Sequence, residues 1–293
     1  MKPMQTHRTT FRKGSRTYYN STRFFPQEVR DDVFRLYGFV RVADDFVDAR
    51  PQDAAGFFRF VERYREARAG TPSGDPIIDG FVELTRRREL DETWVDAFLH
   101  AMQLDLEKAA YDSMDETLEY VWGSAEVIGL FMARLIGLPS ESFPYARMQG
   151  RAMQYINFIR DIDEDRLLGR RYLPLADSGL PGLDRHSAQA HPDLFACFIR
   201  EQITHYRRWQ AQAEIGYRFI PARYLVPIKT ASDMYGWTAD RIEADPFVVF
   251  DHKVRPTRSR IVIQGLTNAI GGLDGSLRAG QPGHRRRAAR AVV

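Results

Sequence analysis

Residues 37–48 read YGFVRVADDFVD and combine helical apolar spacing with three aspartates. Wound as an α-helix at about 100° per residue, the stretch places Asp44 and Asp48 one turn apart on one face. The same face carries Val33, Tyr37, Val40 and Arg41. Carboxylates on a largely apolar helix face are costly unless a cation meets them. The stretch therefore predicts a helix that carries a cation-binding pair.

A second stretch, residues 154–165, reads QYINFIRDIDED and repeats this arrangement. Its polar stripe on a helix would contain Gln154, Asn157, Asp161 and Asp165. Asp161 and Asp165 have the same i, i+4 spacing as the first pair, and Arg160 lies beside them as Arg41 does in the first stretch. One acidic cluster usually marks a solvated face. Two pairs, each beside an apolar arc and an arginine, favour a shared site.

Paired carboxylates on facing helices can hold hard divalent cations. Mg²⁺ prefers oxygen ligands and is commonly shared with substrate phosphates, and Mn²⁺ takes similar ligands. Carboxylates alone would repel a diphosphate, whereas a metal ion and arginine would bind it and stabilise it as a leaving group. An apolar bundle would enclose a hydrocarbon chain. The pattern predicts a Mg²⁺-dependent enzyme, with Mn²⁺ as a substitute, acting on such a diphosphate.

The rest of the chain reads as helices separated by breakers, with little strand-like alternation. The predicted helices are 27–49, 52–69, 76–89, 92–111, 114–137, 141–168, 192–218, 222–244 and 256–270. The longest irregular stretch covers about residues 173–191. No break is long enough to separate two domains. We therefore expect one all-α domain over residues 1–270, followed by a basic, disordered tail at 271–293.

The net charge of +3 comes from that tail. After Asp274 there is no acid, and five of the 42 basic residues follow it: Arg278, Arg285, Arg286, Arg287 and Arg290. The remaining 37 face 39 acidic residues, so the body is near neutral and no nucleic-acid partner is predicted. We expect the tail to be a solvated end, with contact to anionic membrane lipid as the alternative.

Cysteine usage and hydropathy limit the cellular locations that are expected for the protein. The single cysteine, Cys197, excludes a disulfide within the chain, and the polar N-terminus has no apolar signal-peptide core. No run approaches the roughly 20 apolar residues of a membrane span. We expect a soluble cytoplasmic protein, peripheral to the membrane at most.

Several blocks, in order, resemble the squalene/phytoene synthase family over about residues 11–270. Residues 14–19 (GSRTYY) look like its opening segment, and residues 25–48 look like its first helix and first aspartate motif. Residues 101–106 (AMQLDL) with Tyr111, and residues 120–129, resemble its central blocks. Residues 154–174, which end in GRRYLP, resemble the second aspartate motif and its exit, the most specific of these signals.

The resemblance implies an isoprenoid-synthase helical bundle with a central apolar cavity and the 1′–1 coupling of two prenyl diphosphates. It implies that the metal ligands and catalytic residues are Asp44, Asp48, Asp161 and Asp165, and that two tyrosines, Tyr120 and Tyr172, are also catalytic. It implies a substrate-binding set of Ser15, Tyr37, Arg41, Gln154, Asn157, Arg160, Tyr235 and Lys253. Lys253 stands where the family often has arginine. Glu126 stands where a small or neutral residue is common, and both a solvent-facing and a cavity position remain open for it.

Within the family, the first choice is phytoene formation from two geranylgeranyl diphosphates through a cyclopropyl diphosphate. The GSRTYY start and the Gly-Ser-Ala block resemble phytoene-type sequences. The alternatives are squalene or dehydrosqualene formation from two farnesyl diphosphates, with NADPH required only for squalene, and a non-catalytic relative. The four aspartates argue against the last. The sequence leaves the substrate chain length and the oligomeric state open.

Overall fold

The computed structural model describes residues 25–273, so the predicted opening segment with Ser15 and the arginine-rich end lie outside the described residues. Within that range the chain is helical, and its β-bridge between Ala110 and Arg171 belongs to no strand. None of the helices in this range is long and apolar enough to cross a bilayer. The all-α prediction is therefore confirmed.

The first half of the fold is a group of helices packed around α3. The helices are α3 (Gln27–Asp48), α4 (Ala54–Ala69), α5 (Pro76–Arg88), α6 (Glu92–Glu107), α7 (Met114–Val121) and α8 (Val127–Leu135). Four of them begin where a side-chain oxygen accepts a hydrogen bond from a free backbone N–H of the first turn. These caps are Asp53, Asp75, Asp91 and Ser113.

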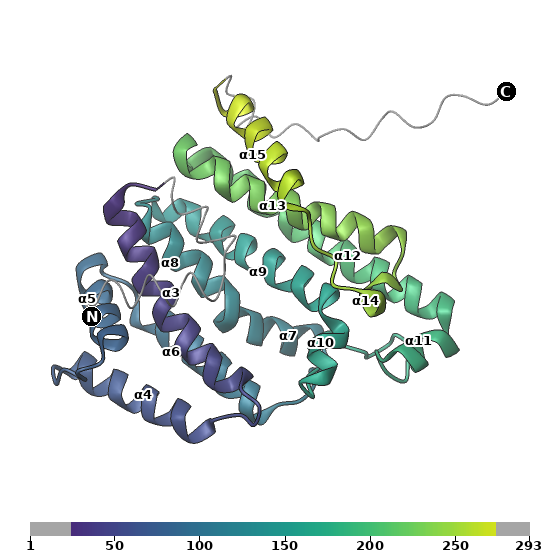
Figure 1. Ribbon diagram of the computed structural model, residues 1–293, viewed down its shortest axis with the longest axis horizontal. Coiled ribbons are helices and arrows are strands. Elements are labelled where there is room, and N and C mark those ends of the chain that lie inside the picture. Colours follow the sequence, from purple (N-terminus) through teal and green to yellow (C-terminus); the bar gives the residue numbers. More distant parts are fainter. Residues whose placement is uncertain (1–24, 274–293) are drawn as a thin grey trace.

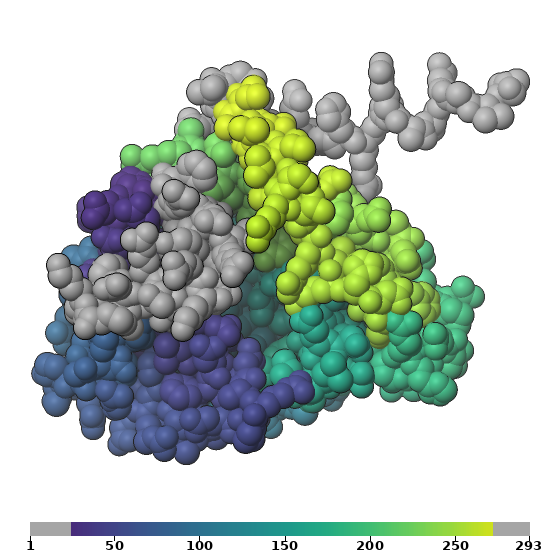
Figure 2. All heavy atoms as spheres, in the orientation of Figure 1, coloured from purple at the N-terminus to yellow at the C-terminus, as the bar shows by residue number. Residues whose placement is uncertain are grey.

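The second half is built on α9, which lies between the first group and the C-terminal helices (Figure 1). Its helices are α9 (Phe143–Arg160), α10 (Ile162–Leu167), α11 (Arg185–Ala190), α12 (Pro192–Ile215), α13 (Ala222–Ala244), α14 (Val248–Asp251) and α15 (Arg258–Leu273). The long helices α9 and α12 pack side by side, and α9 also contacts α8. Figure 2 shows α15 as a ridge at the surface of this half.

Aromatic packing holds α3 inside the first group. Phe39 is fully buried and stacks on Phe81 of α5 with ring centroids 4.0 Å apart. Phe131 of α8 meets the same Phe81 edge to face. Phe39 and Phe131 are both buried core residues, and their packing on Phe81 fixes the orientation of α3 within the first group.

The structure differs from the predicted elements in three segments. The predicted helix 141–168 begins with a 3₁₀ turn (Ser140–Ser142) and is interrupted at Asp161, whose ψ of 16° departs from helical geometry. The predicted helix 92–111 stops at Glu107 because the backbone of residues 109–111 pairs with Arg171 instead. The irregular stretch 173–191 contains α11, capped by Asp184.

The predicted helix 114–137 contains a π-helical turn, Trp122–Glu126. A side chain at Gly123 would meet the carbonyl oxygen of Ala97 at 2.2 Å, so glycine lets this turn lie directly on α6. Turns of this kind often occur at functional sites because they re-aim side chains. Here the turn directs Glu126 into the protein, where it is fully buried. Glu126 therefore does not face solvent, one of the two positions that the sequence left open for it.

Candidate active site

The first aspartate pair lies at the end of α3, half-buried and already engaged with cations. Arg41 donates to Asp44 at 2.7 Å and contacts Asp45 at 2.5 Å, one turn along the helix. Asp48 accepts a hydrogen bond of 2.8 Å from Arg170, which lies 122 residues further along the chain. Apart from the buried Val33, the residues of the predicted stripe of α3 are half-buried.

The second pair spans the break between α9 and α10. Asp161 is the C-cap of α9, and its carbonyl still accepts a 2.8 Å bond from the backbone N–H of Asp165. This bond preserves the one-turn spacing of the two carboxylates despite the interruption. Arg160 donates two hydrogen bonds, of 2.7 and 2.5 Å, to the carboxylate of Asp161.

Two residues from the C-terminal half reach this second pair. Lys253 lies 3.0 Å from the Asp161 carboxylate and also contacts Glu164. Tyr235, half-buried on α13, lies close enough to Arg160 to contribute to the raised pKa of that guanidinium. The structure therefore places both predicted residues beside the second aspartate motif.

Asp105 and Arg170 connect the two motifs. Arg170 is buried, donates to Asp48 and to the carbonyl of Val47 at 2.7 Å, and lies 3.8 Å from Asp105. The charge of Asp105 acts on both Asp44 and Asp165, and it raises the pKa of each. Asp105 and Arg170 therefore couple the two motifs electrostatically, and a metal site shared by both motifs stays a prediction.

Both predicted tyrosines bind Asp105. Tyr120 of α7 donates to one carboxylate oxygen at 2.8 Å, and Tyr172 donates to the other at 2.7 Å. Burial raises the pKa of both phenols, so they remain protonated donors. Their rings stack at 4.9 Å, and Phe158 stacks on Tyr172 at 4.4 Å. The result is a buried aromatic wall beside the carboxylates.

Burial and, after it, neighbouring negative charge strongly raise the pKa of two of the aspartates. Burial, followed by the neighbouring charge of Asp48, raises the pKa of Asp44 to about 7. Burial, followed by the charge of Asp161, raises the pKa of Asp165 to about 8. Arg170 opposes the shift at Asp165 without cancelling it. Such groups gain most from a further cation because it favours their ionised form.

The donor set suits a hard divalent cation. Asn157 and Gln154 lie half-buried on α9, and the side-chain oxygen of Asn157 is buried with no hydrogen-bond partner among the described residues. Carboxylate and amide oxygens are the ligands that Mg²⁺ uses. Among the described residues, no three Asp, Glu, His or Cys side chains converge closely enough to hold a metal ion alone. The set therefore fits an ion that also takes oxygen ligands from substrate and water.

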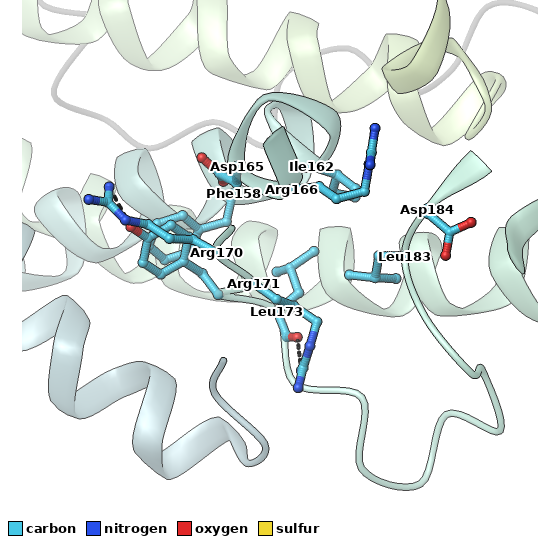
Figure 3. Close-up of a pocket in the computed structure, with 10 residues that line it drawn as sticks. Phe158, Ile162, Asp165, Arg166, Arg170, Arg171, Leu173, Leu183 and Asp184 are labelled. Carbon is cyan, nitrogen blue, oxygen red and sulfur yellow. Dashed lines mark hydrogen bonds between the residues drawn. The ribbon is translucent and has the colours of Figure 1, made fainter. Parts of the chain in front are cut away.

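A pocket of about 130 Å³ lies next to this site (Figure 3). Asp165 and Arg170 lie at one end of it, and Leu183 and Asp184 lie at the other. Binding sites for small molecules usually measure 300–1,000 Å³, so this pocket alone is too small for a prenyl chain. The central apolar cavity implied by the resemblance remains a prediction.

Sequence reasoning missed Asp105 and Arg170 as site residues. Asp105 carried a readable signal, because it continues the apolar stripe of Val95, Phe98 and Met102 on α6 at spacings of three and four. Arg170 gave no such signal, because it lies outside any regular helix. Tyr37 is half-buried on α3, and burial raises its pKa although Arg41 opposes the shift; Asp44 and Asp45 also raise it, so Tyr37 lies near the first pair.

Comparisons with known proteins place the chain among related sequences. The family model described as squalene/phytoene synthase matches residues 11–260. The chain is 27% identical over 233 residues to a 15-cis-phytoene synthase of Paracoccus sp., covering 76% of each chain. It is 25% identical over 248 residues to a 15-cis-phytoene synthase of Pantoea ananas, covering 80% of each.

Solved structures share the fold. A dehydrosqualene synthase superposes with a TM-score of 0.80 at 20% identity, covering 94% of this chain and 97% of that one. A squalene synthase from Alicyclobacillus acidocaldarius superposes with a TM-score of 0.75 at 22% identity, covering 84% and 94%. With the family model spanning most of the sequence, the chain belongs to the squalene/phytoene synthase family, whose members are prenyltransferases that condense prenyl diphosphates head to head.

Proposed function

We propose that this protein couples two geranylgeranyl diphosphates, through a cyclopropyl diphosphate, to phytoene in a Mg²⁺-dependent reaction. The observation that carries the proposal is the pairing of two half-buried carboxylate motifs through Asp105 and Arg170. The choice of C20 chains rests on the curated relatives, which are named phytoene synthases.

The cations of the site have a natural second role. Arg41, Arg160 and Lys253 each contact a motif carboxylate. Mg²⁺ bound to those carboxylates would supply Lewis-acid stabilisation of the diphosphate leaving group. Arg41, Arg160 and Lys253, no longer needed as partners of those carboxylates, would then donate charge-assisted hydrogen bonds to diphosphate oxygens. Asp44, Asp48, Asp161 and Asp165, with the free oxygen of Asn157, are the residues that would hold the metal.

The chemistry requires a protected carbocation. The C1–O bond of one substrate breaks, and the diphosphate leaves with the bonding electrons. The C2–C3 double bond of the second chain attacks that carbon, and loss of a proton closes the cyclopropane ring. The ring faces of Tyr120, Tyr172 and Phe158 can stabilise the cation, and their burial excludes water from it.

Product analysis tests the proposal. The purified protein is incubated with Mg²⁺ and either farnesyl or geranylgeranyl diphosphate, with and without NADPH, and the organic extract is examined by mass spectrometry. We expect a C40 hydrocarbon without NADPH, and loss of turnover with EDTA that Mg²⁺ or Mn²⁺ restores. A C30 product would reassign the chain to dehydrosqualene formation, or to squalene formation if NADPH is needed. No coupled product from folded protein would favour the non-catalytic alternative.

A further inference from the structure

The loop that joins α3 to α4 contacts two helix ends of the candidate active site (Figure 1). Gln52 in this loop donates its side-chain amide to the carbonyl of Val47 at 2.8 Å and to the carbonyl of Asp105 at 2.9 Å. Val47 precedes Asp48 at the end of α3, and Asp105 lies in the last turn of α6. One amide group therefore connects the two helix ends that carry Asp48 and Asp105.

Both acceptors are carbonyls that a helix cannot satisfy by itself. The last turn of an α-helix has no following turn to supply backbone N–H donors. α3 ends at Asp48 and α6 ends at Glu107, so the carbonyls of Val47 and Asp105 both belong to such turns. An amide has two N–H groups, one for each carbonyl. Gln52 therefore caps both helices at once, although the residue is exposed at the surface.

Arg170 connects the same two helix ends from the interior. This buried residue donates to the carboxylate of Asp48 at 2.8 Å and to the carbonyl of Val47 at 2.7 Å, and it lies 3.8 Å from the carboxylate of Asp105. Arg170 thus links the acidic side chains, whereas Gln52 links the backbones that carry them. The carbonyl of Val47 accepts from both residues.

The acids on these helix ends repel each other. Burial raises the pKa of Asp105, Arg170 opposes the shift, and the charge of Asp48 adds to it. Like charges this close favour separation of the groups that carry them. The Gln52 amide holds the two backbones together without adding a positive charge. The acids therefore keep their negative charge available for a further cation, which a lysine or arginine at position 52 would partly neutralise.

We propose that Gln52 is a positioning residue for the condensation reaction. Its two hydrogen bonds set the separation of the α3 and α6 ends, and through them the placement of Asp48 relative to Asp105. Gln52 acts through these helix ends and not by contact with the reacting atoms. The inference rests on the proposed metal-dependent function, in which Asp48 is one of the metal ligands.

Removal of the two donors tests this role in the full-length protein. Gln52→Met keeps the length of the side chain and Gln52→Glu keeps its shape, but neither can donate to a carbonyl. We expect kcat to fall about tenfold in Gln52→Met and at least as much in Gln52→Glu, because groups that orient metal ligands have effects of this size. The dissociation constant for Mn²⁺, titrated by electron paramagnetic resonance with inorganic pyrophosphate present, should rise about tenfold.

Gln103 provides the matched control. It lies on α6 near the same helix end, but its amide donates to the exposed carboxylate of Glu107, one turn along the same helix, at 2.7 Å. Gln103→Met therefore removes a hydrogen bond within one helix and none between helices. We expect this variant to match the wild type in kcat and in Mn²⁺ affinity.

The two readouts separate this proposal from the proposed function. Turnover is measured with whichever of farnesyl or geranylgeranyl diphosphate the wild type couples. If the wild type couples neither, the proposed function fails, and the Mn²⁺ titration still tests Gln52. Wild-type kcat and wild-type Mn²⁺ affinity in folded Gln52→Met would overturn the positioning role. A loss of kcat that equals the loss of folded protein in circular dichroism, with unchanged Mn²⁺ affinity, would assign Gln52 to stability alone and would also overturn it.

Discussion

Two sites in this protein that contain acidic side chains have opposite charge balance. At the π-helical turn, Glu126 is fully buried and accepts from Arg147 at 2.8 Å and from Arg151 at 2.6 Å. Both guanidinium groups also lie over tryptophan rings, Trp122 at 4.7 Å and Trp209 at 5.4 Å. One acid is thus met by two cations and two aromatic faces, and the cluster needs no further partner.

The candidate active site has the reverse balance. Its acids are Asp44, Asp45, Asp48, Asp105, Asp161, Glu164 and Asp165, and within residues 25–273 the cations that contact them are Arg41, Arg160, Arg170 and Lys253. Burial first, and the charges of the neighbouring carboxylates second, raise the pKa of Asp44 and Asp165. The comparison teaches that acidic side chains serve the stability of the fold where nearby cations balance their charge. Where the charge is not balanced, they can bind a further cation.

The largest expected effect is a loss of kcat when an acid of the candidate active site is replaced. Asp44→Asn or Asp161→Asn should lower kcat by about 10²–10³-fold, because the neutral amide binds the metal and orients the diphosphate poorly. The control is Asp163→Asn, on α10 between the second pair, whose carboxylate pairs with Arg166 instead. Wild-type turnover in the Asp44 or Asp161 variant would remove these residues from the site.

The next effect concerns stability at the other cluster. Glu126→Gln should lower the free energy of unfolding by about 2–3 kcal/mol, since it leaves two guanidinium groups without their counter-charge. Urea denaturation measures this, and the folded variant should retain its turnover. The exposed pair of Asp240 with Arg207 provides the control, and Asp240→Asn should change stability by less than about 0.5 kcal/mol.

A smaller effect tests the link made by Asp105. Tyr172→Phe removes a hydroxyl that donates to Asp105, and we expect kcat to fall by about tenfold. Tyr111 belongs to the same ring stack, but its hydroxyl makes no hydrogen bond among the described residues. Tyr111→Phe should therefore change kcat by less than about twofold. Equal losses in the two variants would show that ring packing, not the Asp105 contact, controls turnover.

The smallest effect is a pH dependence of stability without metal. The folded pKa of Asp165 lies above its unfolded value, so the folded state binds more protons and stability falls as pH rises from about 4 to 8. Asp165→Asn removes this loss. The variant should match the wild type near pH 4 and exceed it by about 1–2 kcal/mol near pH 8. A constant difference between the two proteins across this range would contradict the pKa shift.

Much of the fold followed from local patterns. Helix existence was predicted well, since apolar spacing and capping residues such as Asp75 and Ser113 act within a few residues. Boundaries failed where distant segments compete. The end of α6 at Glu107 depends on pairing with Arg171, and the break at Asp161 lies where Arg160 and Lys253 hold its carboxylate.

The sequence by itself determined the helical class, the family, and the two i, i+4 aspartate pairs, because side chains one turn apart share a face in any α-helix. Only the tertiary structure showed that Asp105 and Arg170 join those pairs, that Glu126 is buried and paired, and that α15 turns its apolar side outward. The physical reason is the distance along the chain over which each property is determined. Helical periodicity is a local property, whereas charge balance and burial depend on residues brought together from distant parts of the chain.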